Sequence, residues 1–361
     1  ELAVVAKTQD IGLVVVDHAL TPVQQRNLEK ALNSKVMDRT GLILEIFGER
    51  AQTKEGRLQV ELAHLSYQKS RLVRSWTHLE RQRGGVGFMG GPGETQIEAD
   101  RRMIQTRITG LEKDLEKIRR TRTLHRARRQ RVPHPVVALV GYTNAGKSTL
   151  FNRITKAGVL AQDMLFATLD PTMRRLNLPK GTRVILSDTV GFVSNLPTTL
   201  VAAFRATLEE VIEAELILHV RDVAHEDFGA QGKDVEDVLQ QLGVNPEKSN
   251  VLEVWNKIDV LGDEQVQALS NRTDSAGRQP VMLSAETGQG VEVLLGVIES
   301  NVTAGSRLTD VTITPERMGL MPWIYQNTTV IEREDLDNGS ARMQVRLSHA
   351  DYQNLMGKLK A

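Results

Sequence analysis

The sequence predicts an α/β fold with a mainly parallel six-stranded sheet at its centre, and three observations support this prediction. Short apolar runs alternate with helical segments from Pro135 to about Thr303, a pattern typical of a parallel sheet covered by helices on both faces. One of these runs leads into a glycine-rich loop that opens a helix. Two long helices with seven-residue periodicity come before this region, and a short strand-rich segment follows it.

We expect four parts in the chain. They are a partial N-terminal α/β domain (residues 1–50), an antiparallel coiled-coil hairpin (51–132) with a glycine-rich tip loop (81–95), a central α/β domain (133–304) and a small C-terminal α/β domain (305–361). Leu2 and Val5 read as the interior of a helix, and no Met precedes Glu1. We therefore expect that residues are missing at the N-terminus.

Composition limits the class of protein. The chain has no cysteine, which excludes disulfides and cysteine-ligated zinc. Its apolar runs are much shorter than the roughly 20 residues that cross a bilayer, and no signal peptide is visible, so we expect a cytoplasmic protein without a membrane segment. The net charge is only +1, but basic residues outnumber acidic ones from Glu61 to Val132 and the balance reverses from Pro133 to Ser306. This asymmetry predicts a polyanionic partner for the basic middle.

The N-terminal domain reads as a small α/β unit. The apolar run Ile11–Asp17 predicts a strand, and Thr21-Pro22 has the residues that start a helix. The short apolar runs Lys35–Asp38 and Leu42–Phe47 fit either a strand or a helix. Four polar residues stand at strand ends, where they could bind a ligand or, in the interpretation we favour, act as loop and capping residues: Asp17, His18, Asp38 and Arg39.

The next two helices carry one apolar seam each. In the first, apolar residues recur every seven positions, with two more in the intervening register: Leu58, Leu65, Leu72 and Leu79, then Leu62 and Trp76. The second helix repeats the pattern with Ile97, Ile104, Leu111 and Ile118, then Ile108 and Leu115. Two such seams joined by a short loop pair as an antiparallel coiled coil. Each arm would be ~30 Å or longer at 1.5 Å per residue.

The tip between these helices holds six glycines from Gly84 to Gly93, which oppose a helix and let another molecule approach the backbone closely. Gly85–Gly90 also matches the dinucleotide pattern G-x-G-x-x-G, but a helix rather than a strand precedes it, so we reject that interpretation. The tip is longer than a passive helix–helix turn needs to be, and Phe88-Met89 could stack on bases or fill a pocket. A passive loop is the alternative.

Arginine is concentrated at the end of the second helix. From Arg119 to Arg131 the sequence has seven arginines and no acidic residue, and Val132–Pro135 then ends the helix. Charge runs usually form solvated faces, but this one exceeds what solubility requires, and phosphate contacts would make RNA binding sensitive to salt. The expected RNA-binding residues are Arg83, Gly84, Gly85, Phe88, Met89, Gly91, Gly93, Arg101, Arg102, Arg122, Arg126, Arg128, Arg129 and Arg131.

Nine residues after the apolar run Val136–Val140 have the sequence of a phosphate-binding loop, G-x-x-x-x-G-K-S, in its strand–loop–helix setting. Backbone N–H groups and the helix N-terminus would hold phosphate oxygens. Lys147 would reach the β- and γ-phosphates, and Ser148 would ligate Mg²⁺. Asn144 is a candidate ligand for a monovalent cation such as K⁺. The whole loop is expected in the site: Gly141, Tyr142, Thr143, Asn144, Ala145, Gly146, Lys147, Ser148 and Thr149.

Three later motifs follow strands in the order that a GTP-binding domain requires. Asp188-Thr189-Val190-Gly191 would hold Mg²⁺ through water with its aspartate and sense the γ-phosphate with its glycine N–H. In Asn256-Lys257-Ile258-Asp259, the last carboxylate can accept bonds from guanine N1–H and the 2-amino group, for which adenine has no equivalent donors. Ser284-Ala285 would place a backbone N–H near guanine O6. The motifs together predict a domain that binds GTP, GDP and Mg²⁺ and hydrolyses GTP to GDP and phosphate.

Two features of this domain concern hydrolysis. One threonine in Phe166–Thr172 should close on Mg²⁺ and the γ-phosphate; position favours Thr168, and Thr172 is the alternative. Phe192 stands where Ras-like proteins have the glutamine that orients the attacking water. We therefore expect slow intrinsic hydrolysis that a partner accelerates, unless another side chain already orients the water. The expected catalytic residues are Lys147, Thr168 and Gly191, the metal ligands Ser148, Thr168 and Asp188, and further nucleotide contacts Phe166 and Thr189.

The motifs together resemble the HflX family of translation-associated GTPases over nearly the whole chain. The most specific parts are, in chain order, Gly90–Gln96, Asp100–Arg102, Gly141–Thr149, Phe166–Thr172 and Asp188–Phe192. The resemblance implies binding to the large (50S) ribosomal subunit and its 23S rRNA, with the hairpin loop directed towards the peptidyl-transferase region. It also implies GTP-dependent splitting of stalled or idle ribosomes, notably under stress, and a family N-terminal domain longer than residues 1–50. We expect a monomer in solution.

The C-terminal segment predicts three strands, a turn before the last strand and a final helix, similar to the family's small C-terminal domain: Asp310–Thr314, Thr328–Glu332, Asp337–Gly339, Met343–Leu347 and Ala350–Leu359. Two other functions stay open at this point. The first is an RNA chaperone or subunit anti-association factor in which the nucleotide is mainly structural. The second is a regulatory GTPase of a non-ribosomal partner.

Overall fold

The structure is a computed structural model that describes residues 1–82, 92–129, 134–156, 172–193, 208, 211–245, 250–274 and 277–360. For residues 73–82, 92–97, 119, 122–129, 348–350 and 360, the structure describes the backbone but not the side chains. The chain divides into two compact units, one containing Glu1–Thr121 and the other containing Arg122–Asn195 and Thr207–Ala361. None of the described helices is long and apolar enough to cross a membrane.

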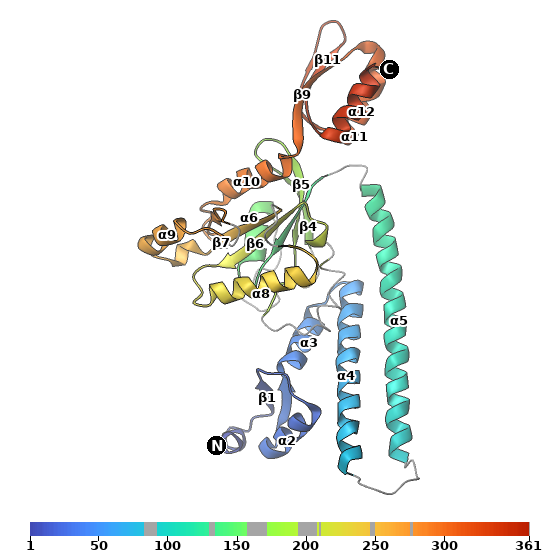
Figure 1. Cartoon of the computed structure of the whole chain (residues 1–361), viewed down its shortest axis with the longest axis vertical. Helices are drawn as coiled ribbons and strands as arrows, with labels where there is room; N and C mark the ends of the chain where they lie inside the picture. Colours follow the sequence, from blue (N-terminus) through green and yellow to red (C-terminus); the bar gives the residue numbers. More distant parts are fainter. Residues whose placement is uncertain are drawn as a thin grey trace. The chain divides into compact units, whose positions relative to one another are not determined.

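The first unit begins with a small α/β motif, α1 (Leu2–Thr8), β1 (Leu13–Val16), α2 (Pro22–Leu32), β2 (Lys35–Asp38) and α3 (Arg39–Arg50), coloured blue in Figure 1. The strands β1 and β2 pair in parallel, with Val14 opposite Val36. Thr21 caps α2 through a reciprocal capping box with Gln24, and Pro22 fills the first position of the helix. The predicted strand and helix start are confirmed, and the two ambiguous runs form β2 and α3.

The hairpin consists of α4 (Lys54–Gln82) and α5 (Pro92–Arg129), which run antiparallel in Figure 1. From Arg101 to Ile118, every residue of α5 is exposed except five, and these five are the predicted seam: Ile104, Ile108, Leu111, Leu115 and Ile118. Outside the seam, Arg107 of α5 pairs with Glu61 of α4 at 2.7 Å. The predicted antiparallel pairing is therefore confirmed over this part of the hairpin.

The boundaries of the tip differ from the prediction of a loop over 81–95. The helix α4 continues to Gln82, and α5 already begins at Pro92. Proline suits the first position of a helix because that position needs no backbone N–H donor. The helix α4 also has a second buried face, with Val60 and Ala63 among its residues, and Gly48 of α3 lies close to Val60. Heptad spacing did not predict this second face.

The second unit is built on a six-stranded sheet in the order β4-β5-β3-β6-β7-β8. Its strands are β3 (Val136–Val140), β4 (Thr172–Asn177), β5 (Arg183–Asp188), β6 (Leu216–Asp222), β7 (Val251–Asn256) and β8 (Val281–Met282). Every pairing is parallel except that of β4 with β5. The described helices of this domain are α6 (Lys147–Thr155), α8 (Phe228–Gln241), α9 (Asp263–Ser270) and α10 (Val291–Thr303). The predicted mainly parallel sheet is confirmed.

The core of this domain is formed by the central strands of the sheet. The central strand β3 is apolar on both faces, β6 begins with the apolar run Leu216–Leu218, and Leu139, Leu216 and Leu218 are completely or almost completely buried. Helices pack on both faces of such a strand, which is why it reads as a continuous apolar run rather than an alternating one. Between residues 194 and 212, the structure describes only residues 208, 211 and 212.

The chain ends in a three-stranded antiparallel sheet of order β10-β11-β9, formed by β9 (Ser306–Ile313), β10 (Thr329–Asp335) and β11 (Ala341–Ser348), with α12 (His349–Lys360) following. The predicted strands, turn and helix are confirmed. A 3₁₀ turn (Pro315–Leu320) and α11 (Met321–Asn327), which the sequence did not predict, lie between β9 and β10. The buried Glu299 of α10 accepts the N–H groups of Lys180 and Thr182 and lies 3.7 Å from Arg346 of β11.

Candidate nucleotide-binding site

The predicted motifs meet at one edge of the sheet, where the parallel strands end. Gly141–Thr149 follows β3, Asp188 ends β5, Asn256 ends β7 and Ser284 comes just after β8. Ligands of open α/β sheets bind outside the carboxyl ends of the strands. The topology therefore brings together motifs that are far apart in the sequence.

Two glycines of the phosphate loop leave no space for a side chain. A Cβ atom at Gly141 would lie 2.2 Å from the Val220 carbonyl oxygen, and one at Gly146 would lie 2.2 Å from the Asn256 amide nitrogen. Gly146 and Asn144 also have positive φ angles of +87° and +62°, a conformation that glycine and asparagine tolerate best. The glycines of the motif are thus required by contacts on the protein side of the loop.

Lys147 lies buried in the loop that precedes it. Its Nζ donates hydrogen bonds to the carbonyl oxygens of Gly141 (3.0 Å) and Tyr142 (2.8 Å). Burial lowers the pKa of Lys147 to about 8, against the opposing effect of the Asp188 charge. An anionic group beside the ammonium would favour its charged form, so a buried lysine in this loop suits a phosphate ligand.

Ser148 and Asp188 bring two hard oxygen ligands together. The Ser148 hydroxyl donates to an Asp188 carboxylate oxygen at 2.7 Å, and Asp188 is completely buried. Mg²⁺ prefers carboxylate, hydroxyl and phosphate oxygens. The residues present therefore fit the Mg²⁺ that the motif implies.

The backbone after β5 is fastened to the phosphate loop. Phe192 donates its N–H to the Gly141 carbonyl (3.0 Å) and accepts the Thr143 N–H (2.7 Å). A Cβ atom at Gly191 would approach both Lys147 Nζ and Thr143 to 3.0 Å. The side chain of Phe192, which replaces the glutamine of Ras-like proteins, is buried.

On the base side, Asn256 connects two loops. Its amide nitrogen donates to the Ala145 carbonyl at 2.9 Å, and its amide oxygen accepts the Ala285 N–H at 2.8 Å. The Ser284 N–H donates to the Gln289 carbonyl, so the N–H groups of Ser284 and Ala285, in the segment predicted to place one N–H near guanine O6, are both bonded within the protein. Asp259, the predicted guanine-reading carboxylate, is exposed in a short 3₁₀ turn (Ile258–Val260).

Sequence reasoning missed two residues that position this side of the site. Asp222, at the end of β6, forms an ion pair with Lys257 at 2.7 Å. Arg153 of α6 donates to the carbonyl oxygens of Ala285 and Glu286. The place of Asp222 after a parallel strand was a usable signal, whereas nothing local identifies Arg153.

Several predicted residues lie outside the description. These are Phe166 and Thr168 in the nucleotide site and Arg83, Gly84, Gly85, Phe88, Met89, Gly91 and Arg131 in the hairpin. Gly93 lies in α5, as do Arg122, Arg126, Arg128 and Arg129, whose side chains are not described. Arg101 and Arg102 are exposed on α5, and Thr172, the alternative to Thr168, is the first residue of β4.

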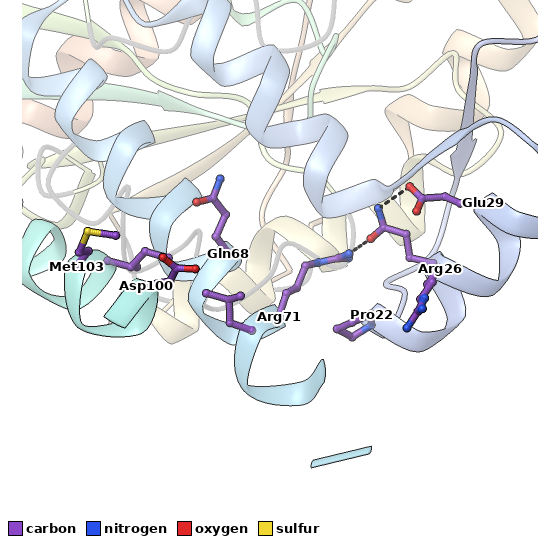
Figure 2. Close-up of a pocket in the computed structure, with 10 residues that line it drawn as sticks. Pro22, Arg26, Glu29, Gln68, Arg71, Asp100 and Met103 are labelled. Atoms are coloured by element: carbon purple, nitrogen blue, oxygen red, sulfur yellow. Dashed lines mark hydrogen bonds between the residues drawn. The ribbon is translucent and has the colours of Figure 1, made fainter. Parts of the chain in front are cut away.

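The first unit has a groove of about 580 Å³ between α2, α4 and α5. Figure 2 shows Arg26 and Glu29 on α2, Arg71 on α4, and Asp100 and Met103 on α5 around it. The charges that line it are of both signs, and Arg71 is held by Gln25 and by the carbonyl of Leu20. The groove therefore shows no preference for an anionic or a cationic ligand.

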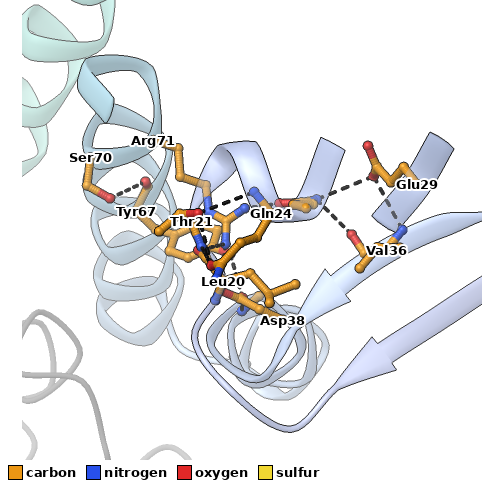
Figure 3. Close-up of polar contacts among 11 residues, drawn as sticks. Leu20, Thr21, Gln24, Glu29, Val36, Asp38, Tyr67, Ser70 and Arg71 are labelled. Carbon is orange, nitrogen blue, oxygen red and sulfur yellow. Dashed lines mark hydrogen bonds and ion pairs between the residues drawn. The ribbon is translucent and has the colours of Figure 1, made fainter. Parts of the chain in front are cut away.

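The polar residues beside this groove satisfy one another, as Figure 3 shows. Asp38 is 2% exposed and accepts hydrogen bonds from the Gly41 N–H (2.8 Å) and the Tyr67 hydroxyl (2.6 Å), and its second oxygen pairs with Arg71 at 2.5 Å. Arg71 also stacks on the ring of Tyr67. Asp17 pairs with Arg39 at 3.0 Å on the surface. Asp38 is thus a capping residue, as the favoured interpretation predicted.

The sheet, the phosphate loop and the N-K-x-D motif define the class of protein: it is a P-loop GTPase. Four family models match the chain. They are described as GTP-binding GTPase N-terminal (residues 1–48), GTP-binding GTPase middle region (50–129), 50S ribosome-binding GTPase (136–257) and HflX C-terminal domain (268–361).

Individual relatives agree with the models. GTPase HflX of Magnetococcus marinus is 58% identical over 303 residues, which are 84% of this chain and 68% of the relative. GTPase HflX of Escherichia coli is 44% identical over 356 residues, 98% of this chain and 82% of the relative. The crystal structure of a GTP-binding protein from Sulfolobus solfataricus in complex with GDP is 23% identical, covers 84% of each chain and has a TM-score of 0.47. The chain belongs to the HflX family of GTPases.

Proposed function

We propose that this GTPase binds the large ribosomal subunit through its α4–α5 hairpin, splits ribosomes in its GTP-bound state and uses GTP hydrolysis to act repeatedly. The distribution of charge along α5 is the observation that supports it most. In the middle of the helix, basic residues pair with acidic neighbours one turn away, as in Arg102–Glu98, Lys117–Asp114 and Arg120–Glu116. From Arg122 to Arg131, no arginine has an acidic residue within four positions. This end of α5 has the charge to contact RNA phosphates.

The nucleotide site would govern this contact. Lys147 would hold the β- and γ-phosphates, Ser148 and Asp188 the metal ion, and the Gly191 N–H would report the γ-phosphate. Mg²⁺, when bound, neutralises negative charge on the phosphate oxygens. Thr168 is proposed as the threonine that closes over them, with Thr172 as its alternative. Because Phe192 is buried and has no hydrogen-bonding side chain, intrinsic hydrolysis should be slow and a ribosomal partner should accelerate it.

Sedimentation of ribosomes with this protein tests the proposal. With GTP or a non-hydrolysable analogue, intact ribosomes should separate into subunits, and the protein should travel with the large subunit; with GDP, ribosomes should stay intact. Splitting that is equally strong without nucleotide would support a chaperone or anti-association factor instead. Absence of the protein from the large subunit in every nucleotide state would refute the proposal.

Two sets of variants test the nucleotide site and the basic end of α5 separately. Ser148→Ala should abolish repeated splitting, because Mg²⁺ loses a ligand, whereas the exposed Ser270→Ala should not. Replacing Arg126, Arg128 and Arg129 together with alanine should lower affinity for the large subunit and flatten its dependence on salt. Arg342→Ala, an exposed arginine of the C-terminal sheet, is the control. Unchanged binding by the triple variant would show that the basic end of α5 does not contact the large subunit.

A further inference from the structure

A cluster of three potential metal ligands comes from β6, β7 and α8. His219 of β6 and Glu253 of β7 are paired residues of neighbouring parallel strands, and Glu236 comes from α8, which Figure 1 shows beside these strands. One ligand atom of each residue lies within 4.8 Å of the others. His219 is 1% and Glu253 is 3% exposed, and Glu236 is half-buried.

The imidazole of His219 supplies an unpartnered nitrogen. Within the described part of the chain, its Nε2 is buried and has no hydrogen-bond partner. Imidazole nitrogen is a common ligand of first-row divalent metal ions. A buried polar nitrogen without a partner is costly, and the imidazole that carries it has a ligand atom within 4.8 Å of both carboxylates.

The Glu253 carboxylate is held in place by donors that do not belong to the cluster. Arg221 Nη1 contacts both of its oxygens, at 2.9 and 3.0 Å, and the Trp255 indole N–H donates to one of them at 2.7 Å. Hydrogen bonds of this kind orient the ligating carboxylates of metal sites. Gly232 of α8 makes room for this arrangement, because a Cβ atom there would lie 2.5 Å from the Arg221 guanidinium.

The cluster has an excess of negative charge. Ligand oxygens of Glu236 and Glu253 lie within 4.8 Å of each other, and two carboxylates this close repel each other. Arg221 is the cation that faces them from β6, and Asp237 and Asp274 add further negative potential at Glu236. A positive ion between the carboxylates and the imidazole would relieve this repulsion.

We propose that His219, Glu236 and Glu253 bind one first-row divalent transition-metal ion of the Zn²⁺ type. One imidazole nitrogen and two carboxylate oxygens suit Zn²⁺, whereas Mg²⁺ prefers an all-oxygen set such as Ser148 and Asp188. Tetrahedral ligands at about 2.1 Å from a common ion lie about 3.4 Å apart. The ligand atoms of the cluster lie within 4.8 Å of one another, so they must approach by at most about 1.4 Å to close on the ion.

Such an ion would join β6, β7 and α8 beside the nucleotide site. The strands β6 and β7 end at Asp222 and Asn256, which position the guanine side of the site. A ligand that binds only the folded state stabilises it. Occupancy should therefore raise the thermal stability of the domain, independently of any contact with ribosomes.

Titration with ZnCl₂ tests the proposal on the whole chain, with GDP and saturating Mg²⁺ present so that the phosphate site is filled. Calorimetry should show one Zn²⁺ bound per chain, and the melting temperature should rise with Zn²⁺. Glu236→Gln should weaken Zn²⁺ binding at least tenfold and remove the rise. Asp237→Asn, which removes the same charge from the exposed neighbouring position of α8, should bind as the wild type does, and so should His225→Ala.

A second variant guards against a folding defect in the first. His219→Gln should also lose Zn²⁺ binding while it retains GDP binding. If the wild-type chain binds no Zn²⁺ under these conditions, the metal site does not exist and the proposal is overturned. Equal Zn²⁺ binding by wild type, Glu236→Gln and His219→Gln would place the ion elsewhere and would likewise overturn the proposal.

Discussion

The nucleotide site and the Asp38 network both bury carboxylates and cations, but they treat them differently. Around Asp38, the acceptors and donors belong to the protein: the Gly41 N–H, the Tyr67 hydroxyl and Arg71 converge on one side chain. Around Lys147, the neighbouring backbone lacks side chains at Gly141, Gly146 and Gly191. The comparison teaches that buried polarity alone does not identify a ligand site. In the nucleotide site, the buried ammonium is held by loop carbonyls, and Gly141 and Gly146 of that loop leave no room for a Cβ atom.

The largest expected effect on stability concerns the Asp38 network. Asp38→Ala should destabilise the β2–α3 region by about 3–5 kcal/mol, because it removes a helix cap and leaves Arg71 without its buried partner. Hydrogen exchange of the amides in β2 and α3 measures this loss. Asp17→Ala, whose carboxylate is 83% exposed, should cost about 1 kcal/mol or less. Affinity for GDP should be unchanged in both, and a loss of affinity in Asp38→Ala would mean that the two regions are coupled.

A second pair of variants tests whether the nucleotide site needs glycine because a side chain would collide there. Gly146 and Gly181 have nearly the same φ, +87° and +86°, but a Cβ atom at Gly181 would meet nothing within 4 Å. Both changes to alanine should cost about 1–2 kcal/mol of backbone strain. Only Gly146→Ala should also displace the Asn256 amide and weaken GDP binding, by about ten- to hundredfold. Equal GDP affinities for the two variants, measured by calorimetry, would contradict this explanation.

The smallest expected effect belongs to one hydroxyl. Tyr67→Phe should cost about 1 kcal/mol, since Tyr67 is partly exposed and gives one bond to Asp38. Burial, followed by the bond to Asp38, raises the pKa of Tyr67 well above its ordinary value of 10.0. The unfolded state then releases this proton first, so Tyr67 stabilises the fold below pH 10 and loses that contribution as pH rises further. Between pH 8 and pH 10.5, the free energy of unfolding, measured by chemical denaturation, should fall less for Tyr67→Phe than for wild type.

The sequence predicted those parts of the fold that have a strong local pattern. The seam of α5 and the strands around Leu139 followed from periodicity and continuous apolar runs. The helix α11 did not, because its single buried residue in the description, Ile324, offers no repeating pattern. The second buried face of α4 also has a long-range cause, its packing near α3.

The candidate site shows the same division. The phosphate loop, Asp188 and Asn256 could be predicted because each belongs to a motif with fixed spacing after a strand. Arg153 could not, since its hydrogen bonds reach Ala285 and Glu286 across more than a hundred positions of sequence. The cluster of His219, Glu236 and Glu253 arises only when two strands align in register and a helix covers them.

The two hydrogen bonds of Asn256 connect the phosphate side of the site to the base side. One runs to Ala145 on the triphosphate side, and the other to Ala285 on the base side. Rearrangement of either segment must stretch or break a bond to the same amide. A variant that disturbs Asn256 should therefore weaken the contacts to the phosphates and to the base together.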